Sequence, residues 1–390
     1  MAGTGQTARS HLFTGPGGAG TSTTAAAAAV RSARSGARTL LLSRQEPHLA
    51  GLDGVAGLTV RVVDPQRALE ALWRDRAAEV AEILPQLALP PASSVVPLPG
   101  TGELALFAEL ARADADVVIV DAGPLDRVVA LMTLPGTLRW WLDQALPPRL
   151  RALGAVRTAA LRAGAVRRGP VDAALAAVPV IEELLGRVGL TDPERTTVTA
   201  VATATRSSAA ALRGAATVLA LNGQRAGAVL VRRLPRGGGA GDWWERRLAE
   251  EAAAVDLLAE VAEVTGVPEL PEAPDDVAAL AGLLRSGELP APAPLAAVSP
   301  ERLDGGWRLT LPLPFAVRGG ADLTRWGDDL VVTVAGVRRS IRLDALLRRC
   351  HVTGGRLMDP GTPAARLEVT FVPDPGQWPA DLLAAEEGAR

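Results

Sequence analysis

Four glycines near the amino terminus have the spacing of a phosphate-binding loop. They are Gly15, Gly17, Gly18 and Gly20. Glycines in such a turn let backbone N–H groups surround an anion, and the amino terminus of a following helix adds partial positive charge. The spacing fits G-x-x-x-x-G-K-[ST], but Thr21 stands in place of the lysine. Ser22 still offers the hydroxyl that would ligate Mg²⁺.

The composition excludes several kinds of chemistry. All 41 basic residues are arginines, and the chain has no tyrosine. No mechanism can therefore use a lysine ammonium or a tyrosine hydroxyl from this chain. The abundance of alanine, glycine and proline is typical of GC-rich coding, which is the simplest explanation for the missing lysine.

The single cysteine, Cys350, excludes internal disulfides and CxxC sites, so we expect no zinc and no iron–sulfur cluster. The net charge of −2 and the 3% aromatic content do not favour nucleic-acid binding. The start MAGTGQTARSHLF lacks the apolar run of a signal peptide, and no long uncharged apolar stretch follows. We expect a soluble, cytoplasmic protein without an integral membrane segment.

The first two-thirds of the chain alternates apolar β-rich runs with helical stretches, which predicts an α/β fold with a mostly parallel sheet. The expected strands are His11–Thr14, Thr39–Ser43, Val117–Asp121, Thr197–Ala202 and Ala228–Val231. The expected helices are Ser22–Ser35, Glu70–Leu84, Ser207–Leu221 and Asp275–Arg285. The region Leu138–Leu190 is too long for one crossover, so we expect a helical insertion there.

A composition change near Leu283–Pro300 indicates a Pro/Ala linker. Short alternating segments follow, which are typical of a small antiparallel β domain. They are Trp307–Pro312, Asp329–Val334, Val337–Leu343 and Arg366–Val372, with a hairpin expected at Ala335–Val337. The last stretch is acidic and interrupted by proline, which is typical of a loosely held tail.

Several segments, taken in order, resemble one family. GPGGAGTST is similar to GKGGVGKTT, the phosphate loop of the ArsA/Get ATPases, which drive arsenite pumps and target tail-anchored proteins. ARTLLLSRQEPHL resembles the strand and first switch of that family, and DVVIVDAGPLDRVVALMTLPGTLRWWLDQ resembles its second switch. AGAVLVRRLPR and the later WRLTLPLPF and LVVTVAGVRRSIRL resemble a further strand and the HSP20-like β-sandwich of bacterial members.

The chain departs from the family at the positions that the resemblance assigns to catalysis. Pro16 takes the place of the lysine that reaches the partner subunit's nucleotide, and Thr21 replaces the loop lysine. Gln45 replaces the aspartate that positions water, and a glutamine cannot accept a proton as a carboxylate does. Arg127 and Arg232 replace the second-switch histidine and a base-contacting asparagine. No catalytic position is intact.

The resemblance implies an organisation in four parts. Residues 1–285 form a P-loop ATPase-like α/β domain with a helical insertion at about 138–190, and residues 286–300 form the linker. Residues 301–373 form an HSP20-like antiparallel β-sandwich, and residues 374–390 form the tail.

The residues expected to contact nucleotide are the four glycines of the loop with Thr21, Ser22 and Thr23, and Mg²⁺ would be held by Ser22 and Asp121. Binding of ATP or ADP with Mg²⁺ is expected to be weak. The principal hypothesis is a pseudo-ATPase that pairs with an intact paralogue in a dimer. The alternatives are a slow Mg-ATPase and a chaperone-like module that binds a hydrophobic client.

Other features leave two interpretations open. The tryptophan pairs in TLRWWLDQ and DWWERR are either packed in the core and between helices or exposed as partner anchors, and we favour packing as the simpler interpretation. His48 aligns with a first-switch histidine, and the basic loops RAGAVRRGP and VRRLPRGGG are more typical of solvated surface than of an anion site.

Overall fold

The computed structural model describes residues 8–47, 51–83, 89–147, 170–235, 237, 241–284, 295 and 298–377. His48, most of the predicted linker and tail, and the middle of the predicted insertion lie outside these ranges. Among the described residues, no helix combines the length and the apolar character that a membrane crossing needs.

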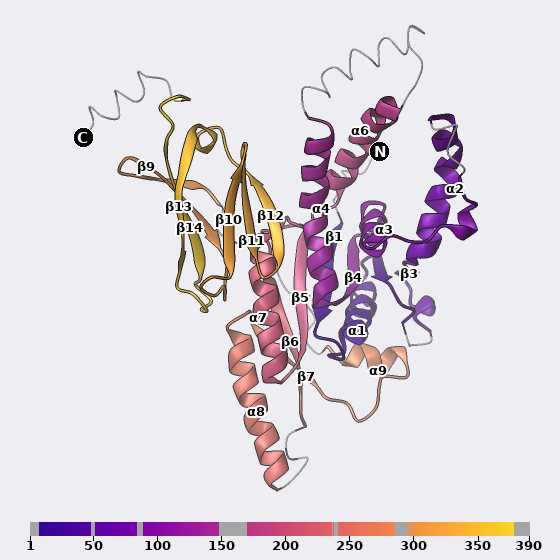
Figure 1. Cartoon of the computed structure of the whole chain (residues 1–390). Helices are drawn as coiled ribbons and strands as arrows, with labels where there is room; N and C mark the ends of the chain where they lie inside the picture. The colour runs from indigo at the N-terminus through magenta and orange to yellow at the C-terminus, as the bar shows by residue number, and fades with distance from the viewer. Residues whose placement is uncertain are drawn as a thin grey trace. The chain divides into compact units, whose positions relative to one another are not determined.

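Seven strands form a sheet in the order β3-β2-β4-β1-β5-β6-β7, flanked by helices (Figure 1). The strands are β1 (Arg9–Gly15), β2 (Thr39–Ser43), β3 (Leu58–Val62), β4 (Val117–Pro124), β5 (Thr196–Thr203), β6 (Ala226–Arg233) and β7 (Val264–Pro268). Parallel pairing joins β2 to β3 and β4, and β6 to β5 and β7. The predicted α/β class with a mostly parallel sheet is confirmed.

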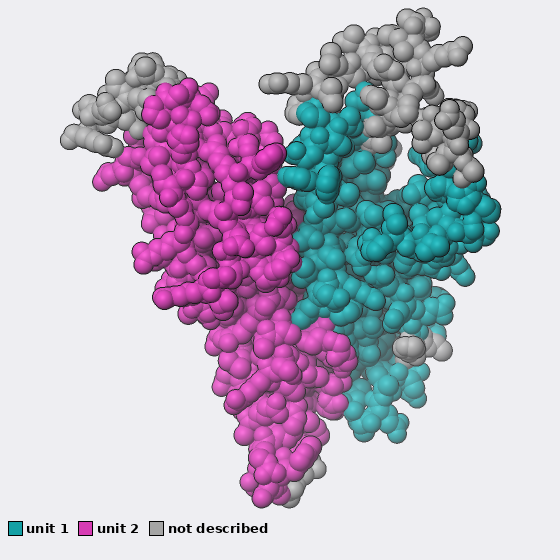
Figure 2. Space-filling model, in the orientation of Figure 1, with its two compact units in different colours: residues 1–14, 20–190, 270–289 teal, residues 15–19, 191–269, 290–390 magenta. Residues whose placement is uncertain are grey.

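The chain divides into two compact units (Figure 2). The first comprises residues 1–14, 20–190 and 270–289, and the second comprises residues 15–19, 191–269 and 290–390. The helices of the first unit are α1 (Thr21–Arg34), α2 (Pro65–Ile83), α3 (Thr101–Ala111), α4 (Leu125–Ala145), α6 (Pro170–Arg187) and α9 (Val277–Gly282), with short 3₁₀ turns at Leu52–Gly54 and Ala92–Ser94. Helix α1 packs on β2 and β4, and α9 packs on α1.

Two helices begin well before the predicted position. Helix α2 begins at Pro65 rather than Glu70, because proline suits the first helical position and the Asp64 carboxylate accepts the backbone N–H groups of Gln66 and Arg67 at 2.9 and 3.2 Å. The helix that contains Leu138 begins at Leu125 and continues past an internal Pro135. Leu138 therefore marks no boundary in this helix.

The second unit contains α7 (Arg206–Leu221), α8 (Asp242–Ala259) and an antiparallel β-sandwich. One sheet has the order β10-β11-β12 and the other has the order β13-β14-β9-β8. These strands are β8 (Pro300–Leu303), β9 (Gly306–Pro312), β10 (Ala321–Trp326), β11 (Asp329–Val334), β12 (Val337–Arg342), β13 (Cys350–Met358) and β14 (Arg366–Pro373), with a 3₁₀ turn at Leu347–Arg349.

The predicted hairpin is confirmed, because Val334 pairs with Val337 across Ala335 and Gly336, both of which have positive φ angles. Two such residues suit the tight turn of a two-residue hairpin. Buried side chains alternate along β9, β11 and β14, so one face of each sheet lines a shared core.

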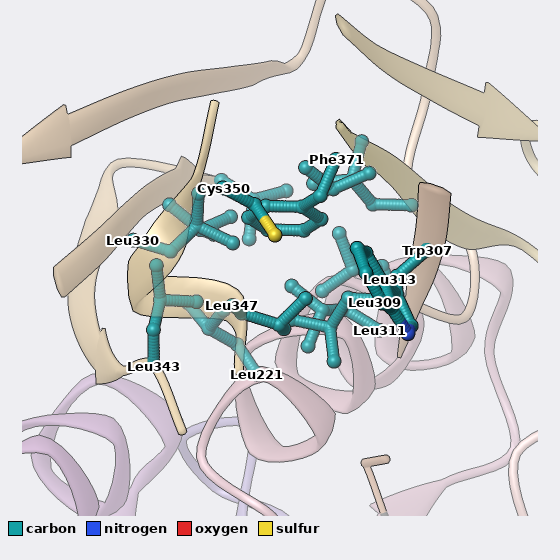
Figure 3. Packing of buried hydrophobic residues seen from close by; sticks show 14 of the residues in the cluster. Leu221, Trp307, Leu309, Leu311, Leu313, Leu330, Leu343, Leu347, Cys350 and Phe371 are labelled. Atoms are coloured by element: carbon teal, nitrogen blue, oxygen red, sulfur yellow. The ribbon is translucent and has the colours of Figure 1, made fainter. Parts of the chain in front are cut away.

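Helix α7 closes one side of the sandwich core. Leu221, the last residue of α7, is 4% exposed and belongs to the same apolar cluster as Leu343, Leu347 and Phe371 (Figure 3). The Arg339 guanidinium on β12 donates to the Leu221 carbonyl, which α7 leaves without a helical partner. Two more contacts add to this attachment. The Thr217 hydroxyl donates to the Pro314 carbonyl at 2.6 Å, and the Arg213 guanidinium lies 4.8 Å from the centroid of the Phe315 ring.

Candidate functional site

The glycine loop leads directly into a helix whose first N–H groups are available. Gly18 and Gly20 have φ angles of 77° and 88°, which only glycine adopts without strain. Gly20 caps α1 without a side-chain hydrogen bond, and the first turn of α1 has no acidic residue. The N–H and the hydroxyl of Thr24 both donate to the Gly20 carbonyl, at 2.9 and 2.8 Å. Such a helix start favours an anion.

A pocket beside this helix start brings together several of the predicted site residues. It is lined by Ser22, Thr23, Ala26, Leu41, Ser43, Gln45, Glu46, Pro47, Asp121, Ala273, Pro274 and Leu280. Ser22, Thr23, Gln45 and Asp121 therefore lie around one space, although three of them are far apart in sequence. The glycines of the loop, Pro16 and Thr21 do not line it.

The Asp121 carboxylate is held at the end of β4. Asp121 is 7% exposed, and its Oδ1 accepts the Gly123 N–H at 3.1 Å. The Ser43 hydroxyl at the end of β2 lies 3.4 Å from Oδ2 and donates to the Gln45 carbonyl at 2.7 Å. The two strands are paired through Leu42 and Val120, so their carboxyl ends meet at one edge of the sheet. The turn after Asp121 is also fixed by Thr14, whose hydroxyl donates to the Gly123 carbonyl at 2.9 Å.

The donor set suits a hard cation. Ser22 offers a hydroxyl and Asp121 a carboxylate, and Mg²⁺ binds one or two such oxygens together with phosphate oxygens and water. A soft metal would find no sulfur or imidazole among the residues that line this pocket.

Sequence reasoning missed Glu46. Glu46 lines the same pocket as Gln45, one residue further along the chain, and it is an acidic residue. The available signal was in the sequence itself: Glu46 is an acidic residue that directly follows Gln45 and directly precedes Pro47. The pocket therefore contains a carboxylate close to the position where the water-positioning group was expected.

An arginine next to the pocket is already paired. Arg44 follows β2 directly, and its Nη1 lies 2.7 Å from Oε1 of Glu103 on α3, with both side chains at most 20% exposed. The guanidinium occupies the space where a Cβ on Gly102 would lie. Glu103 thus neutralises the Arg44 charge and leaves it poorly available to a ligand.

Two further replacements lie in different settings. Arg232, at the end of β6, pairs through Nε with the Glu269 carboxylate at 2.7 Å. Arg127, in the first turn of α4, packs its side chain against Gly123.

One tryptophan of each pair is exposed rather than packed in the core. Trp141 is 61% exposed and Trp243 is 66% exposed, so the core interpretation is wrong for these two residues. Trp141 meets Trp140 edge to face with ring centroids 4.9 Å apart, and Trp243 lies 6.0 Å from Trp244. Their role as partner anchors stays a prediction.

Comparisons with known proteins give the same family as the sequence motifs. Residues 52–286 match the family of anion-transporting ATPases. The chain belongs to this family. Residues 304–371 match the HSP20-like domain found in ArsA, which corresponds to the β-sandwich. The predicted resemblance to the ArsA/Get ATPases is therefore confirmed.

Two bacterial relatives match this chain over nearly all of its length. An uncharacterized protein of Streptomyces coelicolor is 36% identical over 397 residues, covering 95% of this chain and 99% of the relative. A protein of Mycobacterium tuberculosis is 31% identical over 445 residues, covering 97% of this chain and 99% of the relative. The region that matches the ATPase family begins at Leu52, after the glycine loop and Gln45.

Proposed function

We propose that this chain is an anion-transporting ATPase family subunit whose nucleotide site has lost fast hydrolysis. The observation that supports the proposal is the lining of the pocket, which contains the carboxylates of Glu46 and Asp121 and no basic side chain. A nucleoside triphosphate develops further charge during phosphoryl transfer, and that charge must be neutralised by cations. The pocket supplies none from its own walls.

The groups that remain fit binding better than turnover. The N–H groups at the start of α1 can donate to phosphate oxygens, and Ser22 and Asp121 would hold Mg²⁺. Bound Mg²⁺ would neutralise part of the phosphate charge. Gln45 can orient a water molecule by hydrogen bonding, but it cannot take its proton.

We expect the purified chain to hydrolyse Mg-ATP at least about 10³-fold more slowly than a family member with intact motifs, because a cation at the transferred phosphate is worth roughly 10³–10⁵ in rate. The measurement is steady-state release of inorganic phosphate by both proteins in the same buffer. Ser22→Ala serves as the background control, because it removes the predicted Mg²⁺ ligand. A wild-type rate within about tenfold of the intact relative contradicts the proposal.

The second part of the proposal is a partner. The family resemblance predicts a dimer in which each subunit reaches the other's nucleotide, and Pro16 cannot do so. When this chain and an intact paralogue carry different tags and are co-expressed, we expect the mixed dimer to dominate in native mass spectrometry. A stable homodimer that excludes the paralogue would refute the pairing.

Glu46 favours one alternative, a slow but genuine Mg-ATPase. Its carboxylate lines the pocket and can accept a proton from water, which Gln45 cannot. If the chain shows a slow Mg²⁺-dependent rate, Glu46→Gln and Ser22→Ala should both abolish it. If Glu46→Gln leaves the rate unchanged, the slow-ATPase alternative is contradicted and the pseudo-ATPase proposal is favoured.

The other alternative, a module that binds a hydrophobic client, is supported by apolar side chains on two helices of the first unit. Trp141 on α4 and Val180 on α6 are 61% and 51% exposed. Site-specific photo-crosslinking from position 141 that captures an apolar segment would favour this alternative, and capture of an intact paralogue would favour the pairing instead.

A further inference from the structure

The pocket has an uncompensated charge. Two of its lining side chains are carboxylates and none is basic, so a phosphate-bearing ligand would meet negative charge on the protein side. The start of α1 and a bound Mg²⁺ offset part of that charge. Any arginine that completes the site must lie close to the pocket and must not already be paired.

Arg44 does not meet the second condition. It lies between two lining residues, Ser43 and Gln45, but its guanidinium is 2.7 Å from the Glu103 carboxylate and mostly buried with it. Pulling the Arg44 side chain towards a ligand would leave Glu103 as an unpaired, largely buried carboxylate, which is costly.

Arg127 is a better candidate, because it contacts the turn that follows Asp121. Within the described part of the chain its guanidinium has neither an ion pair nor a hydrogen bond, and the residue is half-buried. Its Cδ and Nη1 lie 3.7 and 3.9 Å from the place that a Cβ on Gly123 would occupy. A guanidinium that is partly withdrawn from water without a carboxylate or carbonyl partner loses hydration and gains nothing in return, which favours an anionic ligand.

The turn under Arg127 is the turn that holds the Asp121 carboxylate. Gly123 donates its N–H to Oδ1 of Asp121, and Asp121 lines the pocket. All of these residues belong to the first unit. The Arg127 side chain therefore lies against the turn whose backbone binds the acidic wall of the pocket, although Arg127 does not itself line the pocket.

We propose that Arg127 binds a phosphate group of a nucleoside phosphate in this pocket and supplies from α4 the positive charge that the glycine loop lacks. This inference rests on the proposed function, because it requires a nucleotide in the pocket. A guanidinium binds phosphate through two parallel N–H groups, which suits this role better than a point charge. Binding of this kind leaves the other replaced positions unchanged, because Pro16 and Thr21 still stand in place of the two lysines and Gln45 in place of the aspartate.

The test is calorimetry of the full chain with Mg-ATP, Mg-ADP and inorganic pyrophosphate. We expect Arg127→Gln to weaken Mg-ATP binding at least about tenfold, because a hydrogen bond to a charged group is worth about 1.5–3 kcal/mol. Arg127→Lys should recover part of that loss. Arg31→Gln is the matched control, since Arg31 carries the same charge in the last turn of α1, far along the helix from Ser22, and should leave the affinity unchanged.

The outcomes separate the two proposals. If the wild-type chain binds none of the three ligands, the nucleotide site itself is refuted, and this inference with it. If the wild type binds and Arg127→Gln binds equally well, only the role of Arg127 is refuted. Equal weakening by Arg127→Gln and Arg31→Gln would show a general charge effect and would also refute it. Thermal unfolding shows whether each variant is folded. If Arg127→Gln does not fold, the affinity of Arg127→Lys for Mg-ATP is compared with that of the wild type instead.

Discussion

Replacing Leu221 by alanine is expected to destabilise the β-sandwich by about 3 kcal/mol. Leu221 belongs to α7, yet its side chain is 4% exposed within the sandwich core, against Leu343 and Leu347. Removing it loses buried apolar area and leaves a cavity, and the strands around it are held by their sheets and cannot easily close the space. A leucine-to-alanine change in a core costs about 2–5 kcal/mol.

Hydrogen exchange measured by mass spectrometry tests this prediction locally. Peptides from β9, β11 and β14 should exchange about 100-fold faster in Leu221→Ala, as a loss of about 3 kcal/mol implies. Leu248→Ala is the control, because Leu248 lies on α8 of the same unit and is 38% exposed. Unchanged protection of the sandwich in Leu221→Ala would mean that α7 does not support this core.

Lowering the pH from about 6.5 to about 4 is expected to cost the protein about 3 kcal/mol through His11 alone. Burial and, to a smaller extent, the positive charge of Arg9 lower the pKa of this imidazole from 6.5 to about 4. The ring is 7% exposed, and its Nδ1 has no hydrogen-bond partner among the described residues. In the unfolded chain the ring takes up a proton below pH 6.5, whereas the folded protein resists protonation until about pH 4.

The sign of the effect follows from these two values. Above pH 6.5 both states hold a neutral ring, so His11 adds no pH dependence, and below pH 4 both are protonated and the loss is complete. Urea unfolding of the wild type and of His11→Leu at several pH values measures the difference. As the pH falls from 6.5 to about 4, the free energy of unfolding of the wild type should fall steadily relative to that of His11→Leu. His351→Gln, which changes an exposed ring on β13, is the control, and a pH dependence that His11→Leu retains in full would contradict the assignment.

The interior of the sheet is predictable from sequence, whereas its edges are not. Thr39–Ser43 is predicted to the residue, because all five of its side chains are buried and its centre is an unbroken run of three leucines. The two missed strands of this sheet, β3 and β7, stand at the two ends of the strand order. Strands there need less apolar character, and these contain exposed Arg61 and, in β7, Gly266 and Pro268.

The candidate site shows a similar division. Ser22 and Asp121 follow from local patterns, a glycine loop before a helix and an acid at the end of an apolar strand. The Arg44–Glu103 pair does not, because 59 residues separate its members and only the folded chain brings them together. The position of Arg127 over Gly123 likewise depends on α4 beginning at Leu125, before the predicted helical insertion at about 138–190.

The contacts of Arg339 and Thr217 have a consequence for how such proteins can exchange parts during evolution. Family comparison separates the ATPase region, residues 52–286, from the HSP20-like domain, residues 304–371. However, Arg339 and Pro314 belong to the second segment and bind Leu221 and Thr217 in the first. A gene fusion that joined this sandwich to another ATPase would form a well-packed protein only if the recipient's helix already ended in a matching side chain. The carboxyl end of α7 and the sandwich are therefore expected to be inherited together.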